Sequence, residues 1–562
     1  MKRLVVVLAA LFTLAGCGIG SGQVIADGVA PKDGPGGTTG ISGPPKRGDL
    51  KNLTPSDLVA AFLQASAANP ADPAARENLM RTYVVGADWR PGGDLKVVHV
   101  INPDERGVNN ADGTYTLKLE LQHIGVLDDN GVLAASDDEG TKEVSFTVVN
   151  IGGELMLRDP PRELLLSDAG LGTYFEARPL YFYSGATLVP DLRYVSQSLS
   201  QEQKSNKLVD WLYDGAAAWL SPSVKRLPPD TRPGVTKAVR GENGSLVIDL
   251  SASVNEVEFR QLREQLARTL IRAPLSSLTI KVQGQVKSAT YTPTIIPARS
   301  TPARYLVADG IVHRLRALGH ESSAAPIPAD VNKNVVAVAF SSGERAFAVV
   351  QQDGGSQRLL VGTRTPITVN LHASHIAQPF WLDHDSQSLL VQADEHIYQI
   401  GLDGKIQQNT EVPGLQGMSA FYDGRRLALV IDGKLYLVSR SETGAIATGA
   451  MQRVRTQFDA VQGVAFGERS QLVVSGSMAG GVHLLRMNLD GSQQILVGET
   501  LQGTVSHIVA EPESGNALFE VQGRGAFEAG STAQSLYEDI DWSPSAGPPA
   551  EKARISAPSF EG

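Results

Sequence analysis

A repeat in the C-terminal half of the chain constrains the fold most strongly. Four aromatic residues, each followed by a turn, lie 41, 40 and 45 residues apart: Phe340, Trp381, Phe421 and Phe466. Each precedes an apolar strand, and in several repeats a tight turn and another strand follow, as in Leu427–Ile431, Asp432-Gly433 and Lys434–Val438. Repeats of about 40 to 50 residues with about four strands each are typical of β-propeller blades. We therefore predict an all-β propeller over residues 300–545.

The number of blades is five or six on this pattern. Five repeats can be counted, and Tyr305–Leu315 together with a segment near 536–543 are available to complete a sixth blade by joining the two ends of the domain. A β-sandwich with regularly spaced hairpins is the alternative fold, which the even spacing disfavours. Residues 546–562 are interpreted as a C-terminal tail.

The first half of the chain predicts two α+β domains. In residues 51–178, a helix opens at Thr54 with Pro55 at its first position, a second spans Pro73–Tyr83, and alternating strands follow. The strands are Leu95–Ile101, Tyr115–Leu121 and Val144–Val149. Two helices before a meandering antiparallel sheet make an α+β domain, and an NTF2-like cone is one candidate for it.

Residues 179–290 form the second predicted unit. A helix over Lys204–Trp219 precedes a strand at Leu246–Leu250, and a second helix starts at Asn255. That helix places Phe259, Leu262, Leu266 and Leu270 on one face. A strand at Leu278–Val282 closes the unit, which is also α+β.

The N-terminus reads as an export signal. Lys2 and Arg3 precede an apolar run, Leu4–Leu14, which is too short to span a bilayer, and Leu14-Ala15-Gly16 stands directly before Cys17. This sequence resembles the bacterial lipobox, so we expect residues 1–16 to be removed as a lipoprotein signal peptide and Cys17 to receive S-diacylglycerol and N-acyl groups. A plain secretory signal followed by a chance cysteine is the alternative. Residues 17–50 are rich in Gly, Ser and Pro and are predicted to be a flexible tether.

Charge and cysteine content exclude several classes of function. The net charge of −10 becomes −12 when Lys2 and Arg3 leave with the signal, which argues against a nucleic-acid partner. Cys17 is the only cysteine, so its acylation leaves no thiol for a disulfide or a thiolate metal site.

Motifs for catalysis or cofactor binding are lacking. The sequence contains no H-E-x-x-H, G-x-S-x-G, S-x-x-K or P-loop pattern. His372 and His375 form H-x-x-H without an evident third metal ligand, and Asp383-His384-Asp385 occupies a turn position of the repeat. Asp128-Asp129 and Asp137-Asp138-Glu139 are read as hairpin-loop charges. We assign no catalytic, metal or cofactor-binding residue and expect no enzyme, although a propeller channel can build a site from scattered residues.

Several motifs in the middle of the chain point to a family. They are Tyr181-Phe182-Tyr183, Leu188–Tyr194, Trp219–Val224, Leu227–Thr231 and Val247–Ser251. Together they resemble the GerMN-containing middle of the LpqB-type lipoproteins of actinobacteria, and the lipobox, Trp89-Arg90-Pro91 and the predicted propeller extend the likeness over the whole chain. One departure is Gly215-Ala216-Ala217-Ala218, where the family commonly has Gly-Pro-Ser; alanine is expected to extend the helix there.

The resemblance implies a non-enzymatic role at the cell membrane. A lipoprotein of this family contacts the extracytoplasmic part of the sensor kinase MtrB and modulates the MtrA–MtrB two-component system, with effects on cell division and cell-envelope homeostasis. Only Cys17 is carried over as a functional residue, with the lipid anchor on the extracytoplasmic face. A module that binds cell-wall glycan or peptidoglycan, and an enzyme with its site in the propeller channel, are the alternatives. Carboxylates or histidines gathered in a roomy channel favour the enzyme.

Overall fold

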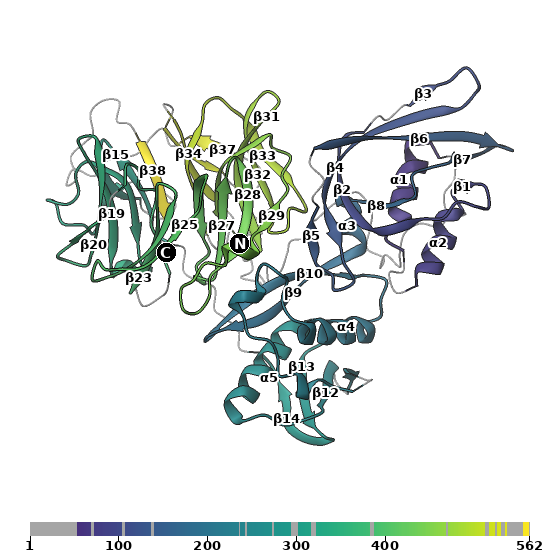
Figure 1. Cartoon of the computed structure of the whole chain (residues 1–562), viewed down its shortest axis with the longest axis horizontal. Helices are drawn as coiled ribbons and strands as arrows, with labels where there is room; N and C mark the ends of the chain where they lie inside the picture. The colour runs from purple at the N-terminus through teal and green to yellow at the C-terminus, as the bar shows by residue number, and fades with distance from the viewer. Residues whose placement is uncertain are drawn as a thin grey trace, which may run out of the picture.

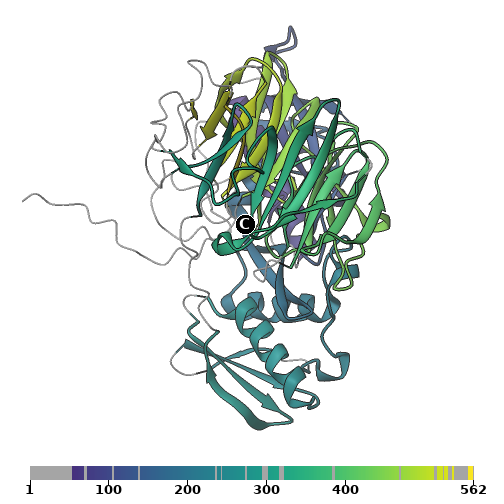
Figure 2. The same cartoon turned by 90° about the vertical axis from the view of Figure 1, so that its left-hand side faces the viewer.

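The computed structural model places an N-terminal domain beside a propeller, and a smaller middle domain lies below both (Figure 1). A view from the side shows the same arrangement, with the propeller in front of the N-terminal domain (Figure 2). The structure describes residues 53–68, 72–103, 107–136, 140–234, 237–241, 244–272, 275–293, 302–315, 322–371, 373–382, 387–467, 470–511, 516–522, 525–529, 534–536 and 555–560.

The N-terminal domain is an eight-stranded sheet covered by helices. Its elements are α1 (Pro55–Ala65), α2 (Pro73–Arg81), β1 (Val84–Val85), β2 (Gly92–Pro103), β3 (Val108–Asn109), β4 (Tyr115–Leu127), β5 (Leu133–Ala135), β6 (Thr141–Ile151), β7 (Glu154–Arg158), β8 (Glu163–Ser167) and α3 (Asp168–Tyr174). The helix start predicted at Thr54 is confirmed, because Thr54 and Asp57 cap α1 reciprocally. The antiparallel meander is correct for β2, β4, β6 and β7, and the short strands β3 and β5 also pair antiparallel with β4.

The parallel pairings in this sheet differ from the predicted meander. β8 pairs with β2 and β1 pairs with β7, both in parallel. Alternation of apolar residues reports which face of a strand is buried, but it carries no information on the direction of the neighbouring strand. The pairing of β8 with β2 brings α3, which follows β8 directly, to the side of the domain that meets the propeller.

The middle domain combines a long hairpin, two helices and a small sheet. Its elements are β9 (Phe175–Ser184), β10 (Thr187–Ser196), α4 (Gln201–Asp214), β11 (Val239–Arg240), β12 (Ser245–Leu250), α5 (Glu256–Leu270), β13 (Ser277–Val282) and β14 (Gln285–Tyr291), with short 3-10 turns at Ser221–Ser223 and Pro229–Thr231. β12 and β13 are parallel and α5 connects them, with its predicted apolar face buried.

Helix α4 is shorter than predicted. It ends at Asp214, not at Trp219, so the expectation that the alanines after Gly215 extend it is wrong. Gly215 adopts φ +103° as the C-cap, and the backbone N–H of Ala217 donates to the Asp191 carboxylate at 2.8 Å. A buried tertiary hydrogen bond therefore overrides the helix propensity of alanine.

The C-terminal half contains six four-stranded sheets among the described residues. Their strands are β15 (Arg304–Ala308), β16 (Ile311–Leu315), β17 (Ser322–Ala324) and β38 (Ile555–Phe560); β18 (Val335–Phe340), β19 (Phe347–Asp353), β20 (Ser356–Gly362) and β21 (Ile367–Val369); β22 (Phe380–Trp381), β23 (Ser388–Ala393), β24 (His396–Gly401) and β25 (Ile406–Glu411); β26 (Leu415–Ala420), β27 (Arg426–Ile431), β28 (Lys434–Ser439) and β29 (Gln452–Val454); β30 (Ala460–Phe466), β31 (Gln471–Met478), β32 (Gly481–Asn488) and β33 (Ile495–Leu501); β34 (Val505–Ala510), β35 (Ala517–Val521), β36 (Gly525–Ala529) and β37 (Gln534–Leu536). Each sheet is one antiparallel blade of the propeller.

The ends of the domain join in one blade, as predicted, but through a different segment. β15 pairs with β38, from Arg304 opposite Phe560 to Ala308 opposite Ile555. Residues 555–560 therefore belong to the propeller and not to a tail. Of the segment near 536–543, which we expected at this position, Leu536 ends β37 of the preceding blade, and residues 537–543 lie outside the described part of the chain.

Candidate interdomain site

Strand β10 is the element at which the three domains meet. Side chains alternate between the faces of a strand, so Val189, Asp191 and Arg193 share one face and Tyr194 lies on the other. All four side chains are almost fully buried. Three of them are polar, and a polar group without water must find partners in the protein, so their contacts define the site.

A buried ion pair ties β10 to the other elements of the middle domain. Arg193 donates through Nη2 and Nε to Asp191 Oδ2 at 2.6 and 3.1 Å. The same guanidinium donates to the carbonyl oxygens of Gly215, after α4, and of Asn130, in the N-terminal domain, both at 2.9 Å. With the Ala217 amide on Asp191, both charges are neutralised and hydrogen-bonded, which a charge buried in low dielectric requires.

The turn between β4 and β5 forms the contact of the N-terminal domain with the middle domain. The indole N–H of Trp211, on α4, donates to the carbonyl of Asp129 at 3.1 Å. Gly131 adopts φ +71°, and a Cβ at this position would lie 2.8 Å from both the Trp211 ring and the Tyr194 carbonyl oxygen. Only glycine fits this turn against the middle domain without displacement of its neighbours.

The other face of β10 contacts a propeller turn after β32. The hydroxyls of Tyr194 and Ser492 are hydrogen-bonded at 2.6 Å, and Asn488 Nδ2 donates to Ser492 Oγ at 3.0 Å and to the Tyr194 oxygen at 3.3 Å. The Ser492 amide donates to Asp490 Oδ1 at 3.0 Å. We call Tyr194, Asn488, Asp490 and Ser492, together with Asp168, the junction cluster.

Asp168 joins the N-terminal domain to the same turn. It is the first residue of α3, and its carboxylate accepts the backbone N–H groups of Gln493 at 2.8 Å and Gln494 at 3.4 Å. A second N-terminal contact lies nearby, where Arg455 Nη2 donates to the Ser136 carbonyl at 2.8 Å. The propeller turn is therefore held by β10 and α3 at once.

Burial changes the protonation of the junction cluster. Desolvation raises the pKa of the Asp490 carboxyl to about 6 against the opposing effect of the Ser492 amide, and the charge of Asp168 raises it further. Desolvation also raises the pKa of Asp168, against the hydrogen bonds from Gln493 and Gln494. Burial and the Asp490 charge raise the pKa of Tyr194 far above its usual range, so its hydroxyl stays neutral. The cluster thus favours protonated carboxyls.

Apolar contacts surround these polar ones. One hydrophobic cluster includes residues of the middle domain together with residues of the propeller. Its middle-domain members are Val189, Ala217, Trp219 and Leu220, and its propeller members include Phe421, Phe458, Val461 and Leu489. Ser439 Oγ also donates to the Trp219 carbonyl at 2.7 Å. The Trp219-Leu220 motif used for the family resemblance therefore forms part of the domain interface.

Two cavities accompany the site. A small one of about 90 Å³ lies where the inner strands of the propeller meet, and it contains all four repeat aromatics, with Gln378 and Ser419 as polar neighbours. The described residues that line it include no Asp, Glu, Lys, Arg or His. A cleft of about 350 Å³ separates the N-terminal and middle domains and is lined by both Trp211 and Tyr194, with Arg76, Lys207 and Asp128 among its charged residues.

Comparisons with known proteins agree with this architecture. The model of the family "Lipoprotein LpqB, N-terminal domain" matches residues 48–171, and that of the "Lipoprotein LpqB beta-propeller domain" matches residues 316–527. Lipoprotein LpqB of Rhodococcus jostii is 24% identical over 93% of this chain and 92% of its own. The chain belongs to the LpqB lipoprotein family.

Further similarities are partial. Lipoprotein LpqB of Mycobacterium ulcerans is 28% identical over 40% of each chain. Among solved structures, TolB of Acinetobacter baumannii covers 47% of this chain with 68% of its own, at 12% identity and a TM-score of 0.30. Strand β10 falls between the two ranges that the LpqB family models match.

Several residues singled out in the sequence lie outside the described part of this LpqB-family chain. They are Cys17, His372, Asp383, His384, Asp385, Asp137, Asp138 and Glu139. His375 is described; its amide donates to Asp394 at 3.0 Å, and burial lowers the pKa of its ring. Within the described ranges, no three candidate ligands gather for a metal ion. No helix in those ranges has the length and apolarity to cross a membrane.

The turn charges and the junction cluster show what sequence reasoning missed. Asp128-Asp129 do lie in a turn between two strands, as predicted, but the turn also contacts α4 of the middle domain. Tyr194 lies in the Leu188–Tyr194 motif of the family resemblance, and no pattern in the sequence marks Asp168 or Asp490 as a site residue. An Asp and an Arg two residues apart in an otherwise apolar strand, Asp191 and Arg193, are the one hint that β10 has buried polar partners.

Proposed function

We propose that this LpqB-family protein is a lipid-anchored extracytoplasmic protein that binds and modulates the sensor kinase MtrB, and thereby influences cell division and cell-envelope homeostasis. Family membership, with relatives matched along nearly the whole chain, carries the proposal. Cys17, acylated at its sulfur and its amino group, supplies the anchor; two or more acyl chains hold a domain stably at a membrane, whereas one does not.

The junction cluster supports a role in binding. Three domains joined by buried hydrogen bonds and a shared apolar core present their surfaces in one fixed arrangement. A partner that changes conformation is biased toward the state that fits such a surface better, because a ligand shifts an equilibrium only by its differential affinity for the two states. The neutral, aromatic lining of the propeller cavity offers contacts to an apolar group of a partner.

Direct binding tests the proposal. The purified full chain in neutral detergent is immobilised and titrated with the extracytoplasmic domain of MtrB, and we expect saturable binding. In cells that lack the lipoprotein, we expect the phosphorylation of MtrA to change. Absence of saturable binding together with unchanged phosphorylation contradicts the proposal.

Two further measurements separate the alternatives. Sedimentation of the protein with purified cell wall, with no binding to the kinase domain, identifies a glycan-binding module instead. The variant Cys17→Ser is expected to move a folded protein into the soluble fraction. If that variant still resists a salt wash of the membranes, lipidation is not the main anchor.

A further inference from the structure

The cleft between the N-terminal and middle domains contains two cations that have no anionic partner in the described part of the chain. Arg76 lines the cleft from α2 of the N-terminal domain, and Lys207 lines it from α4 of the middle domain. The volume of the cleft is about 350 Å³. Sites for small molecules have volumes of about 300–1,000 Å³, so the cleft is large enough to hold a ligand.

The guanidinium of Arg76 uses none of its N–H donors within the protein. It forms no hydrogen bond and no ion pair with any residue that the structure describes, and its nitrogen atoms stay accessible from the cleft. Burial lowers the pKa of Arg76, although the charge of Asp129 opposes this shift. Arg81, on the same helix, instead donates to the Ala87 carbonyl at 2.7 Å. Arg76 is therefore a half-buried cation without compensation.

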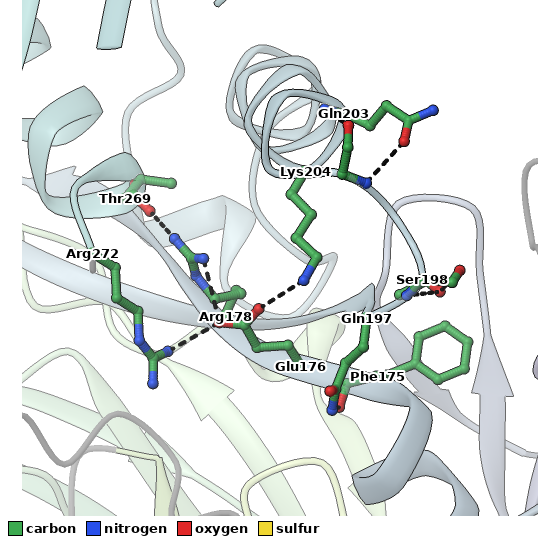
Figure 3. Close-up of polar contacts among 11 residues, drawn as sticks. Phe175, Glu176, Arg178, Gln197, Ser198, Gln203, Lys204, Thr269 and Arg272 are labelled. Atoms are coloured by element: carbon green, nitrogen blue, oxygen red, sulfur yellow. Dashed lines mark hydrogen bonds and ion pairs between the residues drawn. The ribbon is translucent and has the colours of Figure 1, made fainter. Parts of the chain in front are cut away.

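Lys207 also lacks a carboxylate partner among the described residues. Its ammonium lies 5.7 Å from the centre of the Trp211 ring and forms no ion pair there. Lys204, one turn earlier on α4, instead has its ammonium 3.5 Å from the Glu176 carboxylate (Figure 3). An aromatic ring attracts an ammonium but accepts no N–H···O hydrogen bond, so the donors of Lys207 remain available to an anion.

Apolar side chains form much of the remaining surface of the cleft. Its lining includes four buried apolar or aromatic residues: Leu95, Leu127, Phe175 and Trp211. The indole of Trp211 is held by its hydrogen bond to the turn between β4 and β5. At the open end of the β9–β10 hairpin, the Gln197 side chain donates to the Phe175 carbonyl at 3.4 Å (Figure 3). A surface that is already ordered loses little conformational entropy when a ligand binds.

Three aspartates line the same cleft and restrict the charge of a ligand. Asp94, Asp128 and Asp129 are all exposed, and Asp128 Oδ1 also accepts the backbone N–H of Val132 at 2.8 Å. Water and salt screen exposed charges more strongly than half-buried ones. The aspartates therefore leave the two cations available to a single negative charge, but they repel a group that carries two.

We propose that this cleft binds a small monoanion in which a carboxylate is joined to an apolar chain. The paired N–H donors of an arginine fit the two oxygens of a carboxylate, so Arg76 and Lys207 hold the charged end. The chain covers the surface of Leu127, Phe175 and their neighbours, and its removal from water favours binding. This inference does not rest on the binding of MtrB, because it uses no surface assigned to the kinase.

Calorimetric titration of the purified full chain with octanoate tests the site. The titration is made at pH 8 and about 0.15 M salt in neutral detergent, and a titration into detergent alone is subtracted. We expect saturable binding, with octanamide, the neutral analogue, roughly tenfold weaker because the charge-assisted hydrogen bonds are lost. Butanoate is expected to bind at least tenfold more weakly than octanoate, because fewer methylene groups leave water. Octyl phosphate, which is a dianion at pH 8, is expected to bind less tightly than octanoate.

Variants of the two cations identify the residues that hold the charge. Arg76→Gln is expected to weaken octanoate binding roughly tenfold and to change octanamide binding by less than about twofold. Lys207→Gln is expected to weaken octanoate binding roughly threefold. Arg260→Gln, an exposed arginine of α5 that does not line the cleft, removes the same charge and should change the affinity for either ligand by less than about twofold.

The comparison of the acid with the amide separates binding of the carboxylate from a structural role of Arg76. A variant that distorts the cleft weakens both ligands, whereas loss of a carboxylate contact weakens octanoate alone. Absence of saturable octanoate binding, equal affinities for octanoate and octanamide, equal weakening of both ligands by Arg76→Gln, or tighter binding of octyl phosphate overturns the proposal. Circular dichroism establishes that each variant is folded, and Lys207→Gln carries the same comparison if Arg76→Gln does not fold.

Discussion

Replacing Asp490 by asparagine is expected to stabilise the protein at neutral pH. Asp490 is buried at the contact between the propeller and β10; one of its oxygens accepts the Ser492 amide, and the other has no hydrogen-bond partner among the described residues. An asparagine keeps the shape and the acceptor for Ser492 but never carries a charge. The variant therefore removes the cost of ionising a carboxyl in a desolvated interface.

The size of this effect follows from the pKa of Asp490. The pKa is raised to about 6 in the folded protein, from an ordinary value of 3.8. A carboxyl whose pKa is raised on folding holds its proton more tightly in the folded state, so folding is destabilised as the pH rises from the unfolded value through the folded one. The full cost, present above the folded pKa, is about 3 kcal/mol, and it falls to about 1 kcal/mol at pH 4.5.

Urea unfolding at pH 4.5 and pH 7.5, followed by intrinsic fluorescence, measures the difference. Asp490→Asn is expected to raise the free energy of unfolding by about 3 kcal/mol at pH 7.5 and by about 1 kcal/mol at pH 4.5. Asp459→Asn, an exposed aspartate of the propeller, is the control and should change it by less than about 0.5 kcal/mol at either pH. A gain that is absent, or the same at both pH values, would refute the assignment of a buried ionisable carboxyl to this contact.

The remaining predictions concern the contacts of β10 and are measured by the same unfolding experiment. Tyr194→Phe removes the hydroxyl that bonds the propeller turn and is expected to cost roughly 1–2 kcal/mol, whereas an unchanged value would mean that water replaces it. Arg193→Ala leaves Asp191 as a buried unpaired charge and is expected to cost about 3–5 kcal/mol; a cost below about 1 kcal/mol contradicts the buried pair. Gly131→Ala adds backbone strain and a clash with α4 and is expected to cost roughly 2–4 kcal/mol. The control Gly113→Ala is expected to cost about 1 kcal/mol, because Gly113 has φ +78° but open space around its Cβ. Equal costs for the two variants would exclude the clash.

The parts of the fold that the sequence predicted have local signals. The reciprocal cap at Thr54 and the two strands on either side of Asp432-Gly433 lie where short-range patterns placed them. The repeat aromatics, including Phe340 and Trp381, all line the propeller cavity, so a period of about forty residues reports the ring of blades even though each blade is short.

The parts of the structure that differ from the predictions depend on contacts between segments that are distant in the sequence. β38 has only six residues, with a proline among them, and its partner β15 is some 250 positions earlier in the chain, so nothing in its own sequence identifies it as a blade strand. The early end of α4 depends in the same way on Asp191, which accepts the Ala217 amide from a different element. Propensity describes what a segment prefers in isolation, and these two segments take the structure that their partners impose.

The junction cluster was beyond sequence reasoning for the same reason, and its composition explains what it contributes. Apolar surfaces such as those of Val189 and Trp219 favour association of the domains, but dispersion and burial change little when the surfaces slide by a fraction of a side chain. Hydrogen bonds depend steeply on distance and angle, so the contacts of Tyr194 and Asp168 with the propeller turn select one orientation among those that the apolar surfaces allow. A buried carboxyl such as Asp490 lowers the stability of the folded protein at neutral pH, so it does not strengthen the association of the domains. Its contribution is better explained by the orientation of the domains, which the turn that contains Asp490 imposes.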